Sequence, residues 1–328
     1  MEENSSTQQI DQSQLIGFNE KVNRIRGEVQ KVIIGQADAI ELFLVSLFTQ
    51  GHVLVEGVPG IAKTLLSKML AKTISSDFSR IQFTPDLMPT DIIGTSVFDL
   101  KSSEFNFKQG PIFSNIVLID EINRAPAKTQ AALFEVMEER QISVDGKTYP
   151  MEQPFLIVAT QNPIEQEGTY KLPEAQLDRF LFRIKVDYPS LEDEKKILKR
   201  FKNDFHTTVA GEVTPVVSPQ EIETYSKLVE SIHIKDELVD YIAEIIYSTR
   251  FSGDLFLGAS PRASLAIMKA SKAITAMRGR DFVIPEDIQY VIKPILNHRI
   301  MLNAEKEMEG TEVEEVIDDI VRSVEVPR

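Results

Sequence analysis

The chain has 328 residues, of which 42% are hydrophobic and 26% charged, an ordinary globular composition with enough length for one large domain or two moderate ones. The absence of cysteine excludes disulfides and thiol chemistry, and no run is long enough to span a membrane, so we expect a cytoplasmic protein. A net charge of −14 disfavours nonspecific binding to nucleic acid, which makes protein the expected partner.

The first part of the chain predicts helices followed by a strand. Residues 1–14 are polar and are expected to form a disordered leader. Apolar residues then recur at helical spacing over 15–29 and 37–48. The valine-rich segment 52–57 indicates a strand, and a Gly/Pro loop separates it from a predicted helix over 63–74.

Further strands are expected along the next hundred residues. Alternation of strands with helices predicts an α/β fold, a parallel sheet covered on both faces. Asp145-Gly146, between alternating residues, predicts a hairpin with a type I′ turn over 141–154. After 188–194 amphipathic helices dominate, so we predict an αβα domain over 15–189 and a smaller, all-helical domain over 190–328. The additional strand candidates are 80–83, 115–119, 154–160 and 181–186.

The loop GVPGIAKT, residues 57–64, joins the first strand to a helix, where backbone N–H groups and the helix N-terminus can hold phosphates. Lys63 is expected to reach the β and γ phosphates and Thr64 to bind Mg²⁺. Ala62 stands where the usual pattern has glycine. The alternative interpretation of this loop alone is a Gly/Pro turn before a surface helix.

Two acidic residues follow the apolar strand IVLI, residues 116–119, at the end where parallel sheets bind ligands. We expect Asp120 to hold Mg²⁺ and Glu121 to act as the general base for an attacking water. Acidic residues after a strand also serve as helix N-caps. Their occurrence together with the phosphate loop favours the catalytic interpretation.

A third strand, 155–160, leads to Gln161-Asn162-Pro163. If this strand is the sheet neighbour of the strand that ends at Asp120, the Asn162 amide lies beside that neighbouring strand. There it can orient water against the γ-phosphate. The alternative role for Asn162 is a turn-former before proline. The four histidines have no ligand-like spacing, so no histidine metal site is predicted: His52, His206, His233 and His298.

Together these motifs resemble those of the MoxR-type AAA+ ATPases, and Ala62 is that family's usual variant of the loop. The resemblance runs from about Ile34 into the C-terminal helices, in the family's order. It rests on EGVPGIAKT (56–64), IVLIDEINRAPAKTQAALFEVMEE (116–139), FLIVATQNPIEQEGTYKLPEAQLDRF (155–180) and GASPRA (258–263).

The resemblance implies roles for further residues. Asn162 matches sensor 1, Arg262 matches sensor 2, and Arg179 matches the arginine finger that completes a neighbour's site. Arg124 and Arg183 compete with Arg179 for the finger role. The hairpin at 141–154 and the segment 83–113 match the insertions of the helix-2-insert clade. The residues expected to contact nucleotide are Ile34, Gly35, Gly57, Val58, Pro59, Gly60, Ile61, Ala62, Lys63, Thr64, Leu65 and Arg262.

The same resemblance implies an AAA+ P-loop αβα sandwich followed by a helical lid, with ATP and Mg²⁺ bound between the subunits of a homo-oligomeric, hexameric ring. Such proteins are chaperone-like factors that mature client complexes, often with a von Willebrand A domain partner. Three alternatives stay open: a metal-chelatase motor subunit, a nucleic-acid-remodelling motor, and a nucleotide-gated scaffold.

Overall fold

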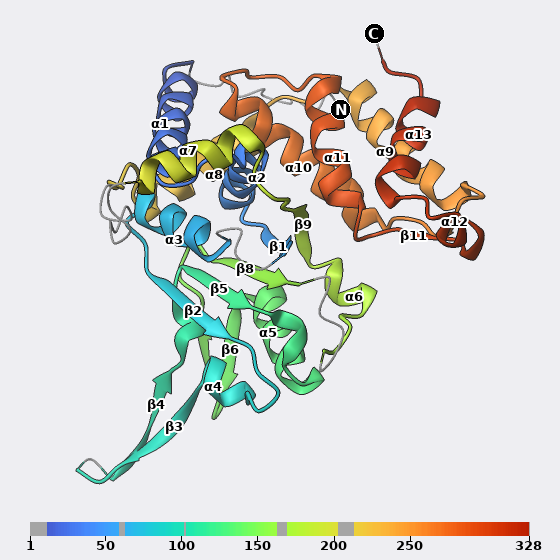
Figure 1. Cartoon of the computed structure of the whole chain (residues 1–328). Helices are drawn as coiled ribbons and strands as arrows, with labels where there is room; N and C mark the ends of the chain where they lie inside the picture. Colours follow the sequence, from blue (N-terminus) through green and yellow to red (C-terminus); the bar gives the residue numbers. More distant parts are fainter. Residues whose placement is uncertain (1–11, 59–62, 102, 163–168, 203–212, 328) are drawn as a thin grey trace, which may run out of the picture. The chain divides into compact units, whose positions relative to one another are not determined.

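The structure is a computed structural model that describes residues 12–58, 63–101, 103–162, 169–202 and 213–327 (Figure 1). It contains two compact units, Ile25–Ile222 and a unit that combines Met1–Arg24 with Glu223–Arg328. In this division residues 12–24 group with the helical unit, and 190–202 and 213–222 group with the α/β unit, so it differs from the predicted boundary at 189/190, which stays a prediction. Among the described residues, no helix has both the length and the apolar character to cross a membrane.

The α/β unit is built on a parallel five-stranded sheet, as predicted. Its central strands are buried along most of their length, which explains their nearly continuous runs of valine, isoleucine and leucine. The strand order is β2-β5-β8-β1-β9, with β2 Phe78–Gln82, β5 Ile116–Asp120, β8 Leu156–Gln161, β1 His52–Glu56 and β9 Phe180–Lys185.

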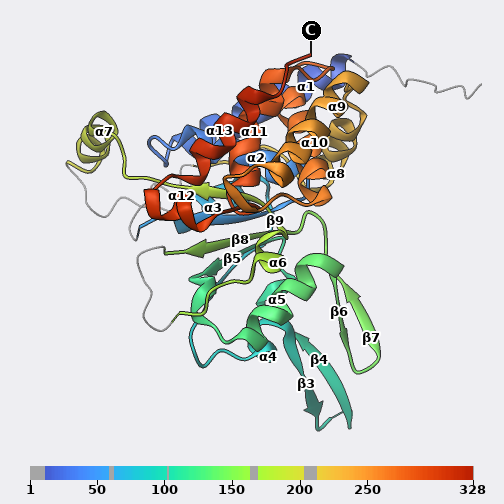
Figure 2. The same cartoon turned by 90° about the vertical axis from the view of Figure 1, so that its right-hand side faces the viewer.

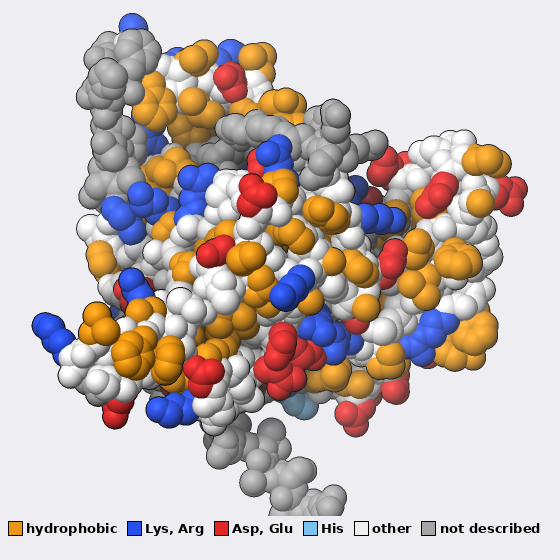
Figure 3. Space-filling model, turned by 90° about the horizontal axis from the view of Figure 1, so that it is seen from below, with side chains coloured by type: hydrophobic (Ala, Val, Ile, Leu, Met, Phe, Trp, Pro, Cys, Tyr) orange, Lys and Arg blue, Asp and Glu red, His pale blue; other side chains and the backbone are white. Residues whose placement is uncertain are grey.

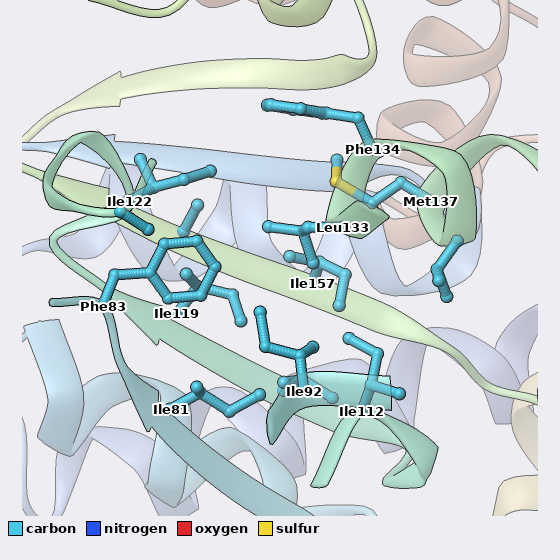
Figure 4. Close-up of a cluster of buried hydrophobic side chains, with 14 of the residues drawn as sticks. Ile81, Phe83, Ile92, Ile112, Ile119, Ile122, Leu133, Phe134, Met137 and Ile157 are labelled. Atoms are coloured by element: carbon cyan, nitrogen blue, oxygen red, sulfur yellow. The ribbon is translucent and has the colours of Figure 1, made fainter. Parts of the chain in front are cut away.

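Helices pack on both faces of this sheet (Figure 2). On one face Ile119 and Ile157 meet Leu133, Phe134 and Met137 of α5 (Ala127–Glu139) in a buried cluster (Figure 4). On the other face lie α2 (Ala37–Phe48) and α3 (Lys63–Thr73). Short helices α4 (Pro89–Ile93) and α6 (Glu174–Leu177), two 3₁₀ turns (Pro111–Phe113 and Ile122–Arg124) and α7 (Leu191–Phe201) complete the unit.

Two hairpins interrupt the winding of the sheet. The predicted hairpin is confirmed as β6 (Gln141–Val144) and β7 (Lys147–Pro150), and both turn residues, Asp145 and Gly146, have positive φ as a type I′ turn requires. A second hairpin, β3 (Gly94–Asp99) and β4 (Glu104–Gln109), lies inside the expected insertion but was not predicted as strands. The β4 sequence alternates polar residues with Phe105 and Phe107, whereas β3 shows no such alternation of polar and apolar residues, so the two strands were not recognised as a pair.

The other unit is helical, with one exception. A two-stranded ribbon, which the all-helical prediction missed, pairs β10 (Leu255–Leu257) with β11 (Met301–Leu302). These strands are too short to show a period. The first helix, α1, begins at Gln12, inside the leader that was expected to be disordered, and residues 1–11 lie outside the described part. The helices with residues in this unit are α1 Gln12–Gln30, α8 Pro219–Ser231, α9 Asp236–Phe251, α10 Pro261–Met277, α11 Pro285–Leu296, α12 Ala304–Glu309 and α13 Val313–Ser323.

Candidate active site at the carboxyl edge of the sheet

Three neighbouring strands end at the same edge of the sheet. The strands β5, β8 and β1 are consecutive in the sheet and parallel, with Ile119 opposite Ala159. The residues that follow these strands, Glu121, Asn162 and Gly57, therefore lie at one edge. The predicted neighbourhood of Asn162 and Asp120 is confirmed, and Asn162 is buried there.

Lys63 and Thr64 form the first turn of α3, directly after the loop that follows β1. The Lys63 ammonium donates to the Gly57 carbonyl at 2.7 Å, so this side chain reaches back across the loop to the end of the strand. Thr64, like Lys63, is partly exposed. The remaining residues predicted for this loop, Pro59, Gly60, Ile61 and Ala62, lie outside the described residues.

Asp120 and Glu121 are held together by a threonine that the sequence interpretation overlooked. The Thr160 hydroxyl donates to Asp120 Oδ1 at 3.0 Å and accepts the backbone N–H of Glu121 at 3.0 Å. Glu121 adopts a left-handed conformation, with φ of 57°, so the chain turns sharply after β5. Asp120 is 7% exposed, whereas the Glu121 side chain is 34% exposed. The buried carboxylate is thus fixed, and the next one faces solvent.

The edge strand β2 contributes two more contacts that were not predicted. Arg80 Nε donates to Asp120 Oδ2 at 2.6 Å, and Gln82 Nε2 donates to Glu121 Oε2 at 2.8 Å. Arg124 also pairs with Glu121, at 3.1 Å. The sequence did contain a signal: Arg80 and Gln82 alternate on a strand that was already predicted, and alternate residues share a face.

The three candidate finger arginines occupy different places. Arg124 pairs with Glu121, and Arg183 donates to Glu56 at 2.6 Å, so both are bound beside the candidate site of their own chain. Arg179 precedes β9 at the amino edge of the sheet. There its guanidinium donates to the Phe134 carbonyl of α5 and pairs with a nearby glutamate, Glu138, at 3.5 Å.

The other residues predicted to contact nucleotide lie in several parts of the chain. Val58 and Leu65 flank the loop in sequence and are partly exposed. Ile34 and Gly35 follow α1, and Gly35 has φ of +75° and lies against the Asp193 carboxylate. Arg262 lies in the helical unit, exposed in the first turn of α10. Their contacts with nucleotide remain predictions.

His52 has a structural role. Its Nδ1 accepts the backbone N–H of Ile157 at 3.0 Å, which leaves Nε2 as the protonated nitrogen that donates to the Met137 carbonyl at 3.2 Å. Burial, together with the nearby charge of Arg140, lowers the pKa of His52 to about 4. His52 is therefore neutral and bridges β1, β8 and α5.

The donors predicted for magnesium are a hydroxyl, on Thr64, and a carboxylate, on Asp120. Hard oxygen ligands of this kind suit Mg²⁺, which keeps several waters and needs few protein ligands. Asp120 is buried, and Arg80 is the cation that pairs with its carboxylate. These residues fit the ion. No group of three or more His, Cys, Asp or Glu suited to a metal occurs within the described ranges.

The fold and this edge define a P-loop nucleoside-triphosphatase of the α/β class. Residues 52–182 match the model of the ATPase family associated with various cellular activities (AAA), and residues 247–320 match the AAA lid domain. The uncharacterized protein YeaC of Bacillus subtilis is 45% identical over 91% of this chain and 92% of its own length. Chaperone MoxR1 of Mycobacterium tuberculosis is 44% identical over 92% of this chain and 81% of its own.

A solved structure agrees with these relatives. A protein from Cytophaga hutchinsonii, described as a candidate ATPase, superposes with a TM-score of 0.89 at 42% identity, covering 96% of this chain and 98% of its own. The chain belongs to the MoxR-type AAA+ ATPases. The fold predicted from the resemblance, an αβα nucleotide-binding domain with a lid, is confirmed.

Proposed function

We propose that the chain hydrolyses ATP to ADP and phosphate in a Mg²⁺-dependent reaction at the carboxyl edge of its sheet. The observation that carries this proposal is that Lys63, at the start of α3 after β1, and Asp120 and Glu121, at the end of β5, lie at the same carboxyl edge of the sheet. A cation, a metal-binding carboxylate and a partly exposed carboxylate are the groups that phosphoryl transfer to water requires.

Each residue has one task in this reaction. Lys63 binds the β and γ phosphates at the N-terminus of α3, where the helix dipole favours anions. Thr64 and Asp120 would hold Mg²⁺, which would neutralise phosphate charge when bound. Asn162 orients the attacking water, and Glu121 accepts its proton as the chain's general base.

We further propose that the sites are completed between subunits of a homo-oligomeric ring, with Arg179 as the finger. Arg179 precedes β9 and Asp120 ends β5, so the two residues lie at opposite edges of a parallel sheet. A strand of this length spans roughly 20 Å, which is too far for Arg179 to serve its own chain's phosphates. A head-to-tail contact that closes on itself produces a ring.

The function of such a ring is to remodel client protein complexes. Similarity to Chaperone MoxR1 supports a chaperone-like role, and the family resemblance suggests a von Willebrand A domain protein as partner. The charge favours a protein client over nucleic acid: the net charge is −14, and basic side chains are interspersed with acidic ones on the face in Figure 3.

The test compares nucleotide binding and turnover in three variants. Lys63→Ala should lose ATP binding in calorimetry, whereas Lys68→Ala, an exposed residue of the same helix, should bind normally. Glu121→Gln keeps the shape of the side chain but removes the base, so it should bind ATP and hydrolyse it orders of magnitude more slowly. ATP binding by Lys63→Ala, or normal turnover by Glu121→Gln, would refute the assignment.

A further inference from the structure

The edge strand β2 places a cation directly on the carboxylate assigned to magnesium. Gln82 lies opposite Asp120 in the register of β2 and β5, and Arg80 precedes it by two positions on the same face. The Arg80 guanidinium contacts Asp120 Oδ2 at 2.6 Å and Gln82 Oε1 at 3.4 Å. Asp120 is therefore paired within its own chain.

Asp120 and Arg80 differ in how far their side chains are exposed and can move. The Asp120 side chain is 11% exposed, and the Thr160 hydroxyl fixes its second oxygen. The Arg80 side chain is 53% exposed and projects from the edge strand of the sheet, where no further strand covers it within the described residues. When the pair opens, Arg80 can move into solvent while Asp120 stays in place.

We propose that Arg80 is a counter-ion that occupies Asp120 when no metal is bound and yields it when a divalent cation arrives with nucleotide. This inference rests on the proposed ATP site. The physical reason is charge: a guanidinium that touches Asp120 and a divalent cation bound to the same carboxylate repel one another across a few ångströms. Arg80 is thus a positioning residue whose release is coupled to metal binding.

The coupling predicts that Mg²⁺ raises the affinity for nucleotide more strongly when Arg80 is removed. Arg80→Gln removes the competing charge, so Mg²⁺ should increase the affinity for a non-hydrolysable ATP analogue about fivefold more in this variant than in the wild type, the size expected for one partly exposed ion pair. Without metal, Arg80→Gln leaves the Asp120 carboxylate without its counter-ion near the phosphates, so the affinity measured in EDTA should be unchanged or lower than that of the wild type.

The experiment is isothermal titration of adenylyl imidodiphosphate with and without Mg²⁺. Arg80→Lys, which keeps the charge, should behave more like the wild type. Arg26→Gln is the matched control, because Arg26 also forms an ion pair with a carboxylate, Glu41 on α2, and the substitution removes the same charge. Circular dichroism of each variant confirms that it is folded.

Two results would overturn the proposal. An unchanged or smaller effect of Mg²⁺ in Arg80→Gln would show that Arg80 does not compete with the metal, or that it supports the metal site. Weaker binding of the analogue in the presence of Mg²⁺ would show that Arg80 binds the phosphates instead. Failure of the ATP site itself gives a different result, in which the wild type and Lys63→Ala do not differ in nucleotide binding under either condition.

Discussion

Stability of the α/β unit should depend on pH through a single buried histidine. His52 is neutral in the fold because Ile157 N–H occupies Nδ1, so protonation would place two N–H groups against each other. Its pKa is lowered to about 4, against an ordinary value of about 6.5 in the unfolded chain. The unfolded chain therefore binds the proton first, and stability is complete above pH 6.5 and is lost as the pH falls through about 4.

The magnitude follows from the difference between the two pKa values. A difference of about 2.5 units corresponds to roughly 3 kcal/mol in total, of which about 2 kcal/mol is lost between pH 7 and pH 5. Urea unfolding of the wild type at these two pH values measures the loss. His52→Asn keeps an oxygen that accepts the Ile157 N–H but does not titrate. Between pH 7 and pH 5 the free energy of unfolding of this variant should therefore fall by about 2 kcal/mol less than that of the wild type.

The exposed His233 provides the matched control. The variant His233→Asn should retain the pH dependence of the wild type, because this ring is not enclosed by the core. If His52→Asn loses as much stability between pH 7 and pH 5 as the wild type does, the assignment of the pH dependence to His52 is refuted.

Three further predictions concern single contacts. Asp287→Asn should lower the free energy of unfolding by about 3 kcal/mol or more in urea titrations, because Asp287 is fully buried between two arginines, whereas Glu223→Gln, on an exposed pair, should leave the midpoint unchanged. Gly35→Ala should destabilise by about 1 to 2 kcal/mol because of its positive φ and the carboxylate 3.1 Å from the added Cβ, whereas Gly17→Ala, on an open helix face, should stabilise slightly in the same assay. Thr160→Val should lower ATP turnover about tenfold, because Asp120 loses a hydrogen bond, while the affinity for ATP in calorimetry changes much less.

The sequence predicted the sheet and the ends of its central strands well. Buried strands such as 116–119 and 155–160 have continuous apolar runs, and polar residues directly after them mark the carboxyl edge. The proximity of Asn162 to Asp120 followed from this logic because parallel neighbours end together. The type I′ turn at Asp145-Gly146 is determined locally by two residues that tolerate positive φ.

Other features depend on contacts between distant parts of the chain. The pairing of Arg80 with Asp120 requires the register of β2 against β5, which no local pattern specifies. Thr160 appeared only as the last residue of a strand, and its two hydrogen bonds to the acids exist only once β5 and β8 are adjacent. In the β3–β4 hairpin only β4 alternates polar and apolar residues, so the sequence offered one strand without a recognisable partner.

The proposed hydrolysis of ATP at sites shared between copies of this chain can be tested with two variants. Arg179→Ala should bind ATP but hydrolyse it about 10³ to 10⁵ times more slowly, as for an arginine finger, and Glu121→Gln should also be nearly inactive. A co-assembled mixture of these two variants contains interfaces where an intact Glu121 meets an intact Arg179 from the neighbour. Phosphate release should therefore reappear in the mixture. A mixture that is shown to co-assemble and still remains as inactive as its parents would contradict the proposal of shared sites.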